Sequence, residues 1–388
     1  MKKIKNNLGA VGVELLIVPA IIIAAILYLS STPTIPPHET ILPEEPGVSD
    51  QIDKPIAKEP ENTENPNKEN DGKINIVTSL EDTIDEDAAW CGIFNLVWND
   101  LRDELVKQDI IFAESNETVE NLNKGTFTVA DISEDSYYKT YGIPTLELKK
   151  QIEKAIKDKF NEKSDILNSF KWDGDPDKYF LYGMLKKEFK FPKKFSKLDA
   201  GTFGNNQKAK YFGIDGSTDS EVKNQVEVLY YNSENDFAIK LLTKQNDEVI
   251  LTVGNDKTTF LEIYNSVIEE SERYIGSKYL ANRDRVKIPN IKFDLKENIS
   301  DVENKPFYFS TGREYVIEKA LQTIQFELDE EGGKIKSEAG MMAATTSIAP
   351  IEVPRYFYVD EAFTIFLIEE GRDLPYFAAK ISDINNIQ

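Results

Sequence analysis

The chain has 388 residues, of which 40% are hydrophobic and 11% aromatic, so it is long and apolar enough to bury a sizeable core. Its formal net charge is −22. A surface this acidic repels phosphate backbones, which argues against nucleic acid as a partner.

Two scarce residue types exclude several kinds of catalysis. The one histidine, His38, lies in a stretch rich in proline and glutamate, so the fold holds no imidazole for a Ser-His-Asp or Cys-His mechanism or for a histidine zinc site. The one cysteine, Cys91, stands in the apolar sequence AWCGIF, where we expect an inert buried side chain. We therefore predict that the chain is not an enzyme, has no small-molecule substrate, and carries no cofactor, metal or internal disulfide.

The first 75 residues predict three segments in succession. Residues 1–7 are basic, residues 8–31 are apolar for the length of a transmembrane helix, and residues 32–75 form a disordered stalk rich in Pro, Glu, Asn and Lys. Because the positive charges precede the apolar run, we expect a single-pass membrane protein of bacterial type with its folded part outside the cytoplasm. A cleaved signal peptide is the competing interpretation.

A second interpretation of the apolar run depends on two residues. Gly9 is followed five residues later by Glu14, which opens an apolar helix. This spacing resembles the type IV prepilin signal, in which the bond after the glycine is cleaved. A pilus-associated subunit is therefore one hypothesis for the function.

Residues 76–388 are expected to form one folded domain. Apolar residues at helical spacing predict helices over residues 87–108, with Asp87 as N-cap, and over residues 145–170. Strands are predicted as a meander over 224–253, a pair broken at Pro289 over 284–295, and two terminal strands over 356–384. Helices come first and strands later, which favours an α+β fold.

Three polar motifs give only weak evidence for a binding site. The acidic sequences at 173–177 and 215–220 read as surface turns, because the first lacks the glycine and glutamate of a calcium loop. A lysine cluster formed by Lys186, Lys187, Lys190, Lys193 and Lys194 suggests either an ordinary solvated face or a site for an anionic glycan.

From about residue 145 onward, the order and spacing of several segments resemble the serpin superfamily. Residues 148–167 are similar to the helix that crosses the serpin sheet, and residues 177–195 to the next strand, with Phe189, Pro192 and Phe195 in the aromatic-Pro-Phe pattern. Residues 226–243, 286–295, 325–333 and 359–381 resemble later strands in the same order, whereas residues 74–144 match poorly. The resemblance implies a large central mixed or antiparallel sheet with helices packed around it.

The same resemblance implies a hinge and an exposed reactive loop near residues 333–350. The hinge would be Glu330, Glu331, Gly332 and Gly333. A serine or papain-like cysteine protease would cut the loop between 341 and 350, and the loop would then insert into the sheet as a new strand. The loop residues singled out are Ile335, Ser337, Ala339, Met341, Met342, Ala343, Ala344, Thr345, Thr346 and Ser347.

The loop sequence both supports and opposes insertion. Every second residue from Gly333 to Met341, including Ile335, is small or apolar, as a buried strand face requires. The residues between them at 334, 336 and 338 are charged. However, inhibitory serpins carry a threonine and alanines after the hinge, whereas here Gly333 loosens the hinge and Ile335 is larger than the usual alanine. The family's buried histidine would fall near Gln322. A protease inhibitor, a non-inhibitory binding or structural module, and an ordinary hairpin turning at 331–333 therefore all stay open.

Overall fold

The computed structural model describes residues 74–333, 353–385 and 387–388, all of which lie in one compact unit spanning residues 66–388. The predicted cytoplasmic segment, membrane segment and prepilin motif lie outside the described residues, as do His38, nearly all of the stalk and the loop from residue 334 to 352. The domain boundaries predicted there stay predictions. In the described ranges, no helix is both long and apolar enough to cross a bilayer.

The largest sheet of the described residues has seven strands in the order β1-β2-β19-β18-β10-β9-β8. All neighbours are antiparallel except the parallel pair β1 and β2. The strands are β1 (Asn75–Ile76), β2 (Ala88–Cys91), β8 (Val226–Ser233), β9 (Asp236–Leu242), β10 (Asp247–Val253), β18 (Phe363–Glu369) and β19 (Phe377–Ile381). The last two strands thus lie in the interior of a sheet built from both ends of the folded domain.

Two four-stranded sheets and two two-stranded sheets complete the sheets of the described residues. One sheet has the order β17-β11-β7-β6, with β6 (Ser196–Phe203), β7 (Gln207–Ile214), β11 (Arg285–Pro289) and β17 (Tyr356–Tyr358). The other has the order β12-β15-β16-β5, with β5 (Phe189–Lys190), β12 (Ile291–Asn298), β15 (Leu321–Asp329) and β16 (Gly332–Gly333). The two-stranded sheets pair β3 (Tyr137–Gly142) with β4 (Phe180–Leu185), which flank helix α3 (Leu146–Phe160) in sequence, and β13 (Pro306–Tyr308) with β14 (Glu314–Val316) in a hairpin.

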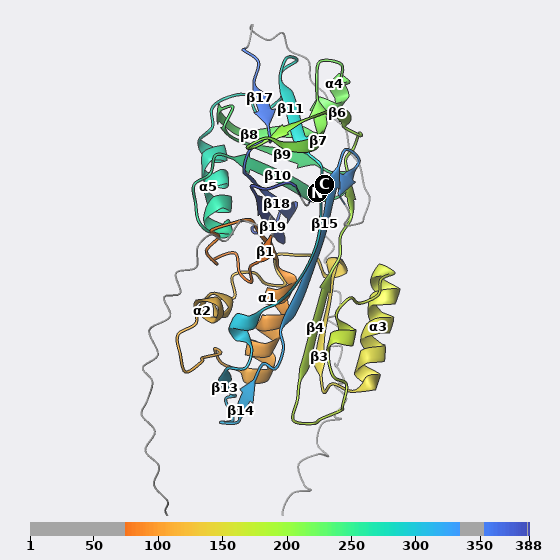
Figure 1. The fold of residues 1–388 in the computed structure, drawn as a ribbon, viewed down its shortest axis with the longest axis vertical. Helices are drawn as coiled ribbons and strands as arrows, with labels where there is room; N and C mark the ends of the chain where they lie inside the picture. The colour runs from red at the N-terminus through yellow and green to blue at the C-terminus, as the bar shows by residue number, and fades with distance from the viewer. Residues whose placement is uncertain (1–73, 334–352, 386) are drawn as a thin grey trace, which may run out of the picture. The chain divides into compact units, whose positions relative to one another are not determined.

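The helices are mostly short. They are α1 (Ile93–Asn99), which continues as a π-helix over Asp100–Val106, α2 (Glu117–Asn123), α3 (Leu146–Phe160), α4 (Ser220–Lys223) and α5 (Phe260–Arg273). Single 3₁₀ turns occupy Glu134–Ser136, Leu167–Ser169 and Ser300–Val302. The longest helix, α3, lies beside β3 and β4 (Figure 1) and buries Ile152 and Ile156 in a small cluster with Phe180 and Tyr182.

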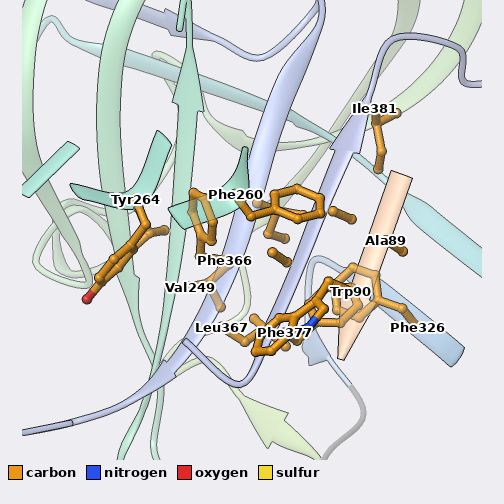
Figure 2. Packing of buried hydrophobic residues seen from close by; sticks show 14 of the residues in the cluster. Ala89, Trp90, Val249, Phe260, Tyr264, Phe326, Phe366, Leu367, Phe377 and Ile381 are labelled. Atoms are coloured by element: carbon orange, nitrogen blue, oxygen red, sulfur yellow. The ribbon is translucent and has the colours of Figure 1, made fainter. Parts of the chain in front are cut away.

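The centre of the seven-stranded sheet is buried on both faces. All seven residues of β18 are buried. On one face Phe366 packs edge-on against Phe260 and Tyr264 of α5, with ring centroids 6.2 and 5.5 Å apart. On the other face Phe377 stacks on Phe326 of β15 at 4.7 Å. Figure 2 shows these rings in one continuous core, which fixes β15 against the sheet.

The structure confirms the predicted α+β class and most of the predicted elements. The helix at 145–170 begins after its N-cap Thr145 and ends at Phe160, ten residues early, because Asn161 adopts a left-handed conformation (φ 55°). The meander at 224–253 is confirmed as β8, β9 and β10, and the region 356–384 holds β17 in addition to the two predicted strands.

One predicted helix is partly wrong. Residues 88–91 form β2, and the helix begins only at Ile93. Asp87 is not an N-cap, because its carboxylate accepts hydrogen bonds from the backbone N–H groups of Ser382 and Asp383. Cross-strand pairing with β19 therefore outweighs the helical periodicity that the sequence shows over these residues.

We predict that Phe366→Ala lowers the free energy of unfolding by about 3–5 kcal/mol, because it leaves a cavity between β18 and α5. Urea denaturation followed by circular dichroism measures this loss. The matched control, Lys208→Ala, truncates an exposed residue of β7 and should leave the midpoint nearly unchanged. A midpoint of Phe366→Ala close to that of the parent chain would contradict this packing.

Candidate functional site

The predicted hinge is a tight turn that follows the long strand β15. β15 ends at Asp329, Glu330 and Glu331 form the turn, and Gly332 and Gly333 form the short strand β16. Beyond Gly333 the predicted loop residues, from Ile335 to Ser347, lie outside the described residues. The predicted hairpin at 331–333 is thus a turn centred one to two residues earlier, and the structure describes two residues of its returning strand.

β16 is paired on both sides. Gly333 stands opposite Leu328 of β15, and Gly332 stands opposite Asp329, in antiparallel register. On its other side the same two glycines pair antiparallel with Phe189 and Lys190 of β5. These two residues therefore join strands that are separated by some 130 residues in the sequence.

Both hinge glycines are required by their surroundings. Gly332 has φ 149°, where side chains are strongly disfavoured, and a Cβ there would collide with the carbonyl oxygen of Phe189. A Cβ on Gly333 would fall 2.9 Å from the carbonyl oxygen of Glu327, and would also meet the Phe189 ring. The pair of glycines thus lets the chain enter between two strands at close range.

The turn is held by backbone and side-chain bonds to the segment that follows β5. Phe191 N–H donates to the carbonyl oxygen of Glu331 at 3.0 Å, and Phe195 N–H donates to that of Glu330 at 2.9 Å. Glu330, whose side chain is 8% exposed, also pairs with Lys194 at 3.2 Å and Lys197 at 3.0 Å. The hinge is therefore fixed from two directions.

These contacts set the ionisation of Glu330. Burial alone would raise its pKa, but the hydrogen bonds from Lys197, from its own backbone N–H and from Lys194 outweigh burial and hold the pKa below its usual value. The carboxylate therefore stays ionised at neutral pH and keeps both lysines bound.

Beyond β16, no strand among the described residues joins β15 to β4, the strand that precedes β5. In the described part of the chain, β4 pairs only with β3, and residues 321–327 of β15 pair only with β12. A cavity of about 730 Å³ lies between these two strands, and residues of both strands line it. Each strand thus presents one edge without a neighbouring strand, and such an edge is a template for an added strand.

The floor of this cavity is the first helix. Ile93, Phe94, Val97 and Leu101 line it, and a Cβ on Gly183 of β4 would lie only 2.7 Å from Val97 Cγ2. We name the space between β4 and β15, floored by residues 93–101, the cleft. Apolar groups beneath two unpaired strand edges suit it to receive a strand with one apolar face.

Gln322 stands on β15 where the serpin resemblance placed a buried histidine. Its Nε2 donates to the carbonyl oxygen of Cys91 at 3.3 Å, but its Oε1 is buried without a hydrogen-bond partner. An unpaired buried acceptor costs about 1–3 kcal/mol, so this position carries a local penalty.

A buried ion cluster lies above the cleft, between β4 and β5. Lys187 pairs with Asp247 of β10 and, at 2.7 Å, with Glu369 of β18, and its ammonium lies 4.6 Å from the centre of the Tyr376 ring. Burial raises the pKa of Asp247, although Lys187 opposes this. The cluster fastens the connection between β4 and β5 to the large sheet.

The other end of the loop is anchored as firmly. Arg355, which precedes β17, donates from Nε and Nη2 to the fully buried carboxylate of Asp284, at 3.1 and 2.8 Å. Its guanidinium also donates to the carbonyl oxygens of Ser277 and Tyr279. The chain is therefore fixed on both sides of the segment 334–352.

The structure also places the remaining sequence candidates. Burial raises the pKa of the Cys91 thiol to about 11, so this thiol is not ionised at neutral pH. Four members of the lysine cluster pair with carboxylates: Lys186 with Glu162, Lys187 with Asp247, Lys193 with Glu221, and Lys194 with Glu331. These pairs do not favour an anionic glycan there. No group of three or more potential metal ligands occurs among the described residues.

The sequence singled out Gln322, Glu330 and Lys187, but their contacts and the role of Arg355 were not predicted. The alternation of β15 marks Gln322 as inward-facing, so its buried amide could have been found from the pattern. The partners of Glu330, Lys187 and Arg355 could not, because each ion pair joins segments distant in sequence.

We predict that Glu330→Gln lowers the free energy of unfolding by about 1 kcal/mol at pH 7. Because the folded-state pKa of Glu330 is lowered, its stabilisation is present above the unfolded value near 4.5 and is lost as the pH falls through the folded value. Urea denaturation at pH 7 and pH 3 should therefore show a difference from the parent chain that fades at pH 3. Glu331→Gln, at an exposed site, is the control. If Glu330→Gln lowered the free energy of unfolding equally at pH 7 and pH 3, the lowered pKa assigned to Glu330 would be contradicted.

Comparison with known proteins gives matches only among solved structures. No family model matches the chain, and no curated protein matches it. Thyroxine-binding globulin in complex with thyroxine is 11% identical, with a TM-score of 0.43 over 77% of this chain and 93% of that one. The thermophilic serpin Tengpin in its native state is 12% identical, with a TM-score of 0.45 over 80% of this chain and 97% of that one. Serpin48 from the insect Tenebrio molitor is 14% identical, with a TM-score of 0.36 over 71% and 73%. The chain is thus similar to solved serpin structures, as its sequence resemblance predicted.

Proposed function

We propose that this chain is a membrane-anchored, extracytoplasmic serpin-like protein in which residues 334–352 act as bait for a serine or cysteine protease. The observation that carries the proposal is β16, a two-residue strand already paired between β5 and β15 at the top of the cleft. Once the loop is cut, its free end extends β16 downward between β4 and β15.

The register of β16 assigns each loop residue a neighbour. Because Gly333 stands opposite Leu328, Ile335 would fall opposite Phe326, and Ser337 opposite Ile324. Opposite residues of antiparallel strands share a face, and these residues of β15 are buried. The alternate loop residues that begin with Gly333, Ile335 and Ser337 would then face the interior, and these are the positions at which the sequence has small or apolar residues.

The gain on insertion comes from pairing two edges at once. Each new backbone hydrogen bond adds about 0.5–1.5 kcal/mol, and the inserted strand forms bonds on both sides. The apolar side chains above the first helix also leave water. Since β16 is already formed, the strand grows from an existing end.

A non-inhibitory surface module on the same fold is the second candidate. The Phe326 ring is already held by Phe293, 5.6 Å away, and Phe377, 4.7 Å away, so it has little freedom to move aside for a large neighbour. Ile335 in place of a small residue would overpack there and slow insertion. A loop that inserts slowly is cut without trapping the protease.

Incubation with elastase-like and subtilisin-like proteases tests the proposal. A complex of chain and protease that survives SDS, together with a sharp rise in the melting temperature after cleavage, is the expected result. Clean cleavage without complex but with the thermal rise would favour the second candidate. Cleavage with neither would contradict insertion itself.

We predict that Ser337→Asp abolishes the complex and the thermal rise, because it places a carboxylate on the buried face. Lys336→Asp, one residue earlier, faces solvent and should retain both. Gel electrophoresis and differential scanning calorimetry measure the two effects. Equal behaviour of the two variants would contradict the register that β16 assigns.

A further inference from the structure

The cleft of the intact chain has the dimensions and lining of a ligand site. Its volume of about 730 Å³ falls within the range of roughly 300–1,000 Å³ that small-molecule pockets occupy. Ile93, Phe94 and Val97 form an apolar floor, and Trp98 lines it as well. Such a lining favours an apolar molecule.

One residue that lines the cleft carries a buried polar atom without a partner. Of the side-chain atoms in the described residues, only Gln322 Oε1 and Asn99 Oδ1 are buried without a hydrogen bond, and only Gln322 lines the cleft. The Gln322 amide nitrogen is already bound to the carbonyl oxygen of Cys91, so its oxygen is the acceptor that stays unused. A ligand with one hydrogen-bond donor would remove this penalty.

Aromatic rings and paired charges at the lower end narrow the ligand class. Phe170 packs edge-on against Phe180 at 5.0 Å, and Tyr179 stacks on Phe309 at 6.1 Å. All four residues line the cleft. Flat ring faces favour an aromatic ligand. The nearby charges of Arg313 and Lys178 are paired with Asp177 and Glu318, which favours a neutral one.

We propose that the cleft binds a neutral aromatic molecule that carries a single hydroxyl or N–H donor, and that this donor bonds to Gln322 Oε1. The molecule would lie over the first helix, between β4 and β15. This site concerns the intact chain and is separate from any contact that a protease makes with the loop.

A matched pair of probes tests the donor. 2-Naphthol has a hydroxyl donor, and 2-methoxynaphthalene has the same rings without one. Each probe is held at low micromolar concentration while the intact chain is titrated and the fluorescence anisotropy is followed. 2-Naphthol should bind at one saturable site and roughly tenfold more tightly than its ether. No saturable binding, or equal affinity for the two probes, would overturn the proposal.

Three variants locate the site. Gln322→Leu should reduce the preference for 2-naphthol to about twofold or less, because it removes the acceptor. Val97→Trp should abolish binding of both probes by filling the floor. Leu101→Phe provides a second, milder filling, should the larger change prevent folding, and should weaken both probes about equally. Lys208→Ala is the control with unchanged binding, and wild-type binding by both filled variants would overturn the proposal.

A bound ligand and an inserted strand would occupy the same space, and this consequence rests on the proposed function. Binding to the uncut chain tests the cleft alone, whereas the thermal rise on cleavage tests insertion alone. Cleaved chain that has inserted its loop should lose the 2-naphthol site. If the cleaved chain binds 2-naphthol as before and its melting temperature does not rise, the insertion hypothesis is contradicted, whereas the ligand site is supported.

Discussion

The site depends on one constraint: two glycines are held between two strands by backbone pairing on both sides. Gly332 and Gly333 bond to β15 and to β5, and no larger residue would fit between Phe189 and Glu327. This pairing closes the upper end of the cleft and sets the direction and register in which the following chain would run. The ion pairs of Glu330 hold the turn in place, and the Lys187 cluster fastens β5 and its neighbours to the large sheet.

Much of the fold followed from local patterns in the sequence. The α3 stripe, the meander of β8 to β10 and the terminal strands carry clear periodicity, so these elements were predicted, although α3 ends ten residues before its predicted end and the terminal region holds one strand more. The prediction was wrong over 88–91, because the apolar run there satisfies helical and strand patterns alike and the choice is made by β19, some 290 residues later. The residues that the resemblance singled out as a hinge form a turn and the short strand β16, but the pairing of β16 with β5 is a long-range contact that no local pattern encodes.

The cleft, too, depends on long-range contacts that local sequence patterns do not predict. Its floor was foreseeable as the apolar face of a helix, and Gln322 as an inward-facing residue of β15. That these elements enclose a space, with a polar acceptor left unpaired on its wall, depends on how β4 and β15 diverge below β16. Local sequence patterns indicate which side chains are buried, but they do not indicate that β4 and β15 lie apart without hydrogen bonds between them.

The anchoring of the chain after residue 352 determines what becomes of it when it is severed. The described residues from Arg355 onward are held in the fold, because β18 and β19 occupy interior positions of the seven-stranded sheet and Arg355 is bound to buried Asp284. A single break between residues 334 and 352 therefore releases no fragment. The two pieces stay together as one particle in solution, and they separate into two chains only once the protein is unfolded.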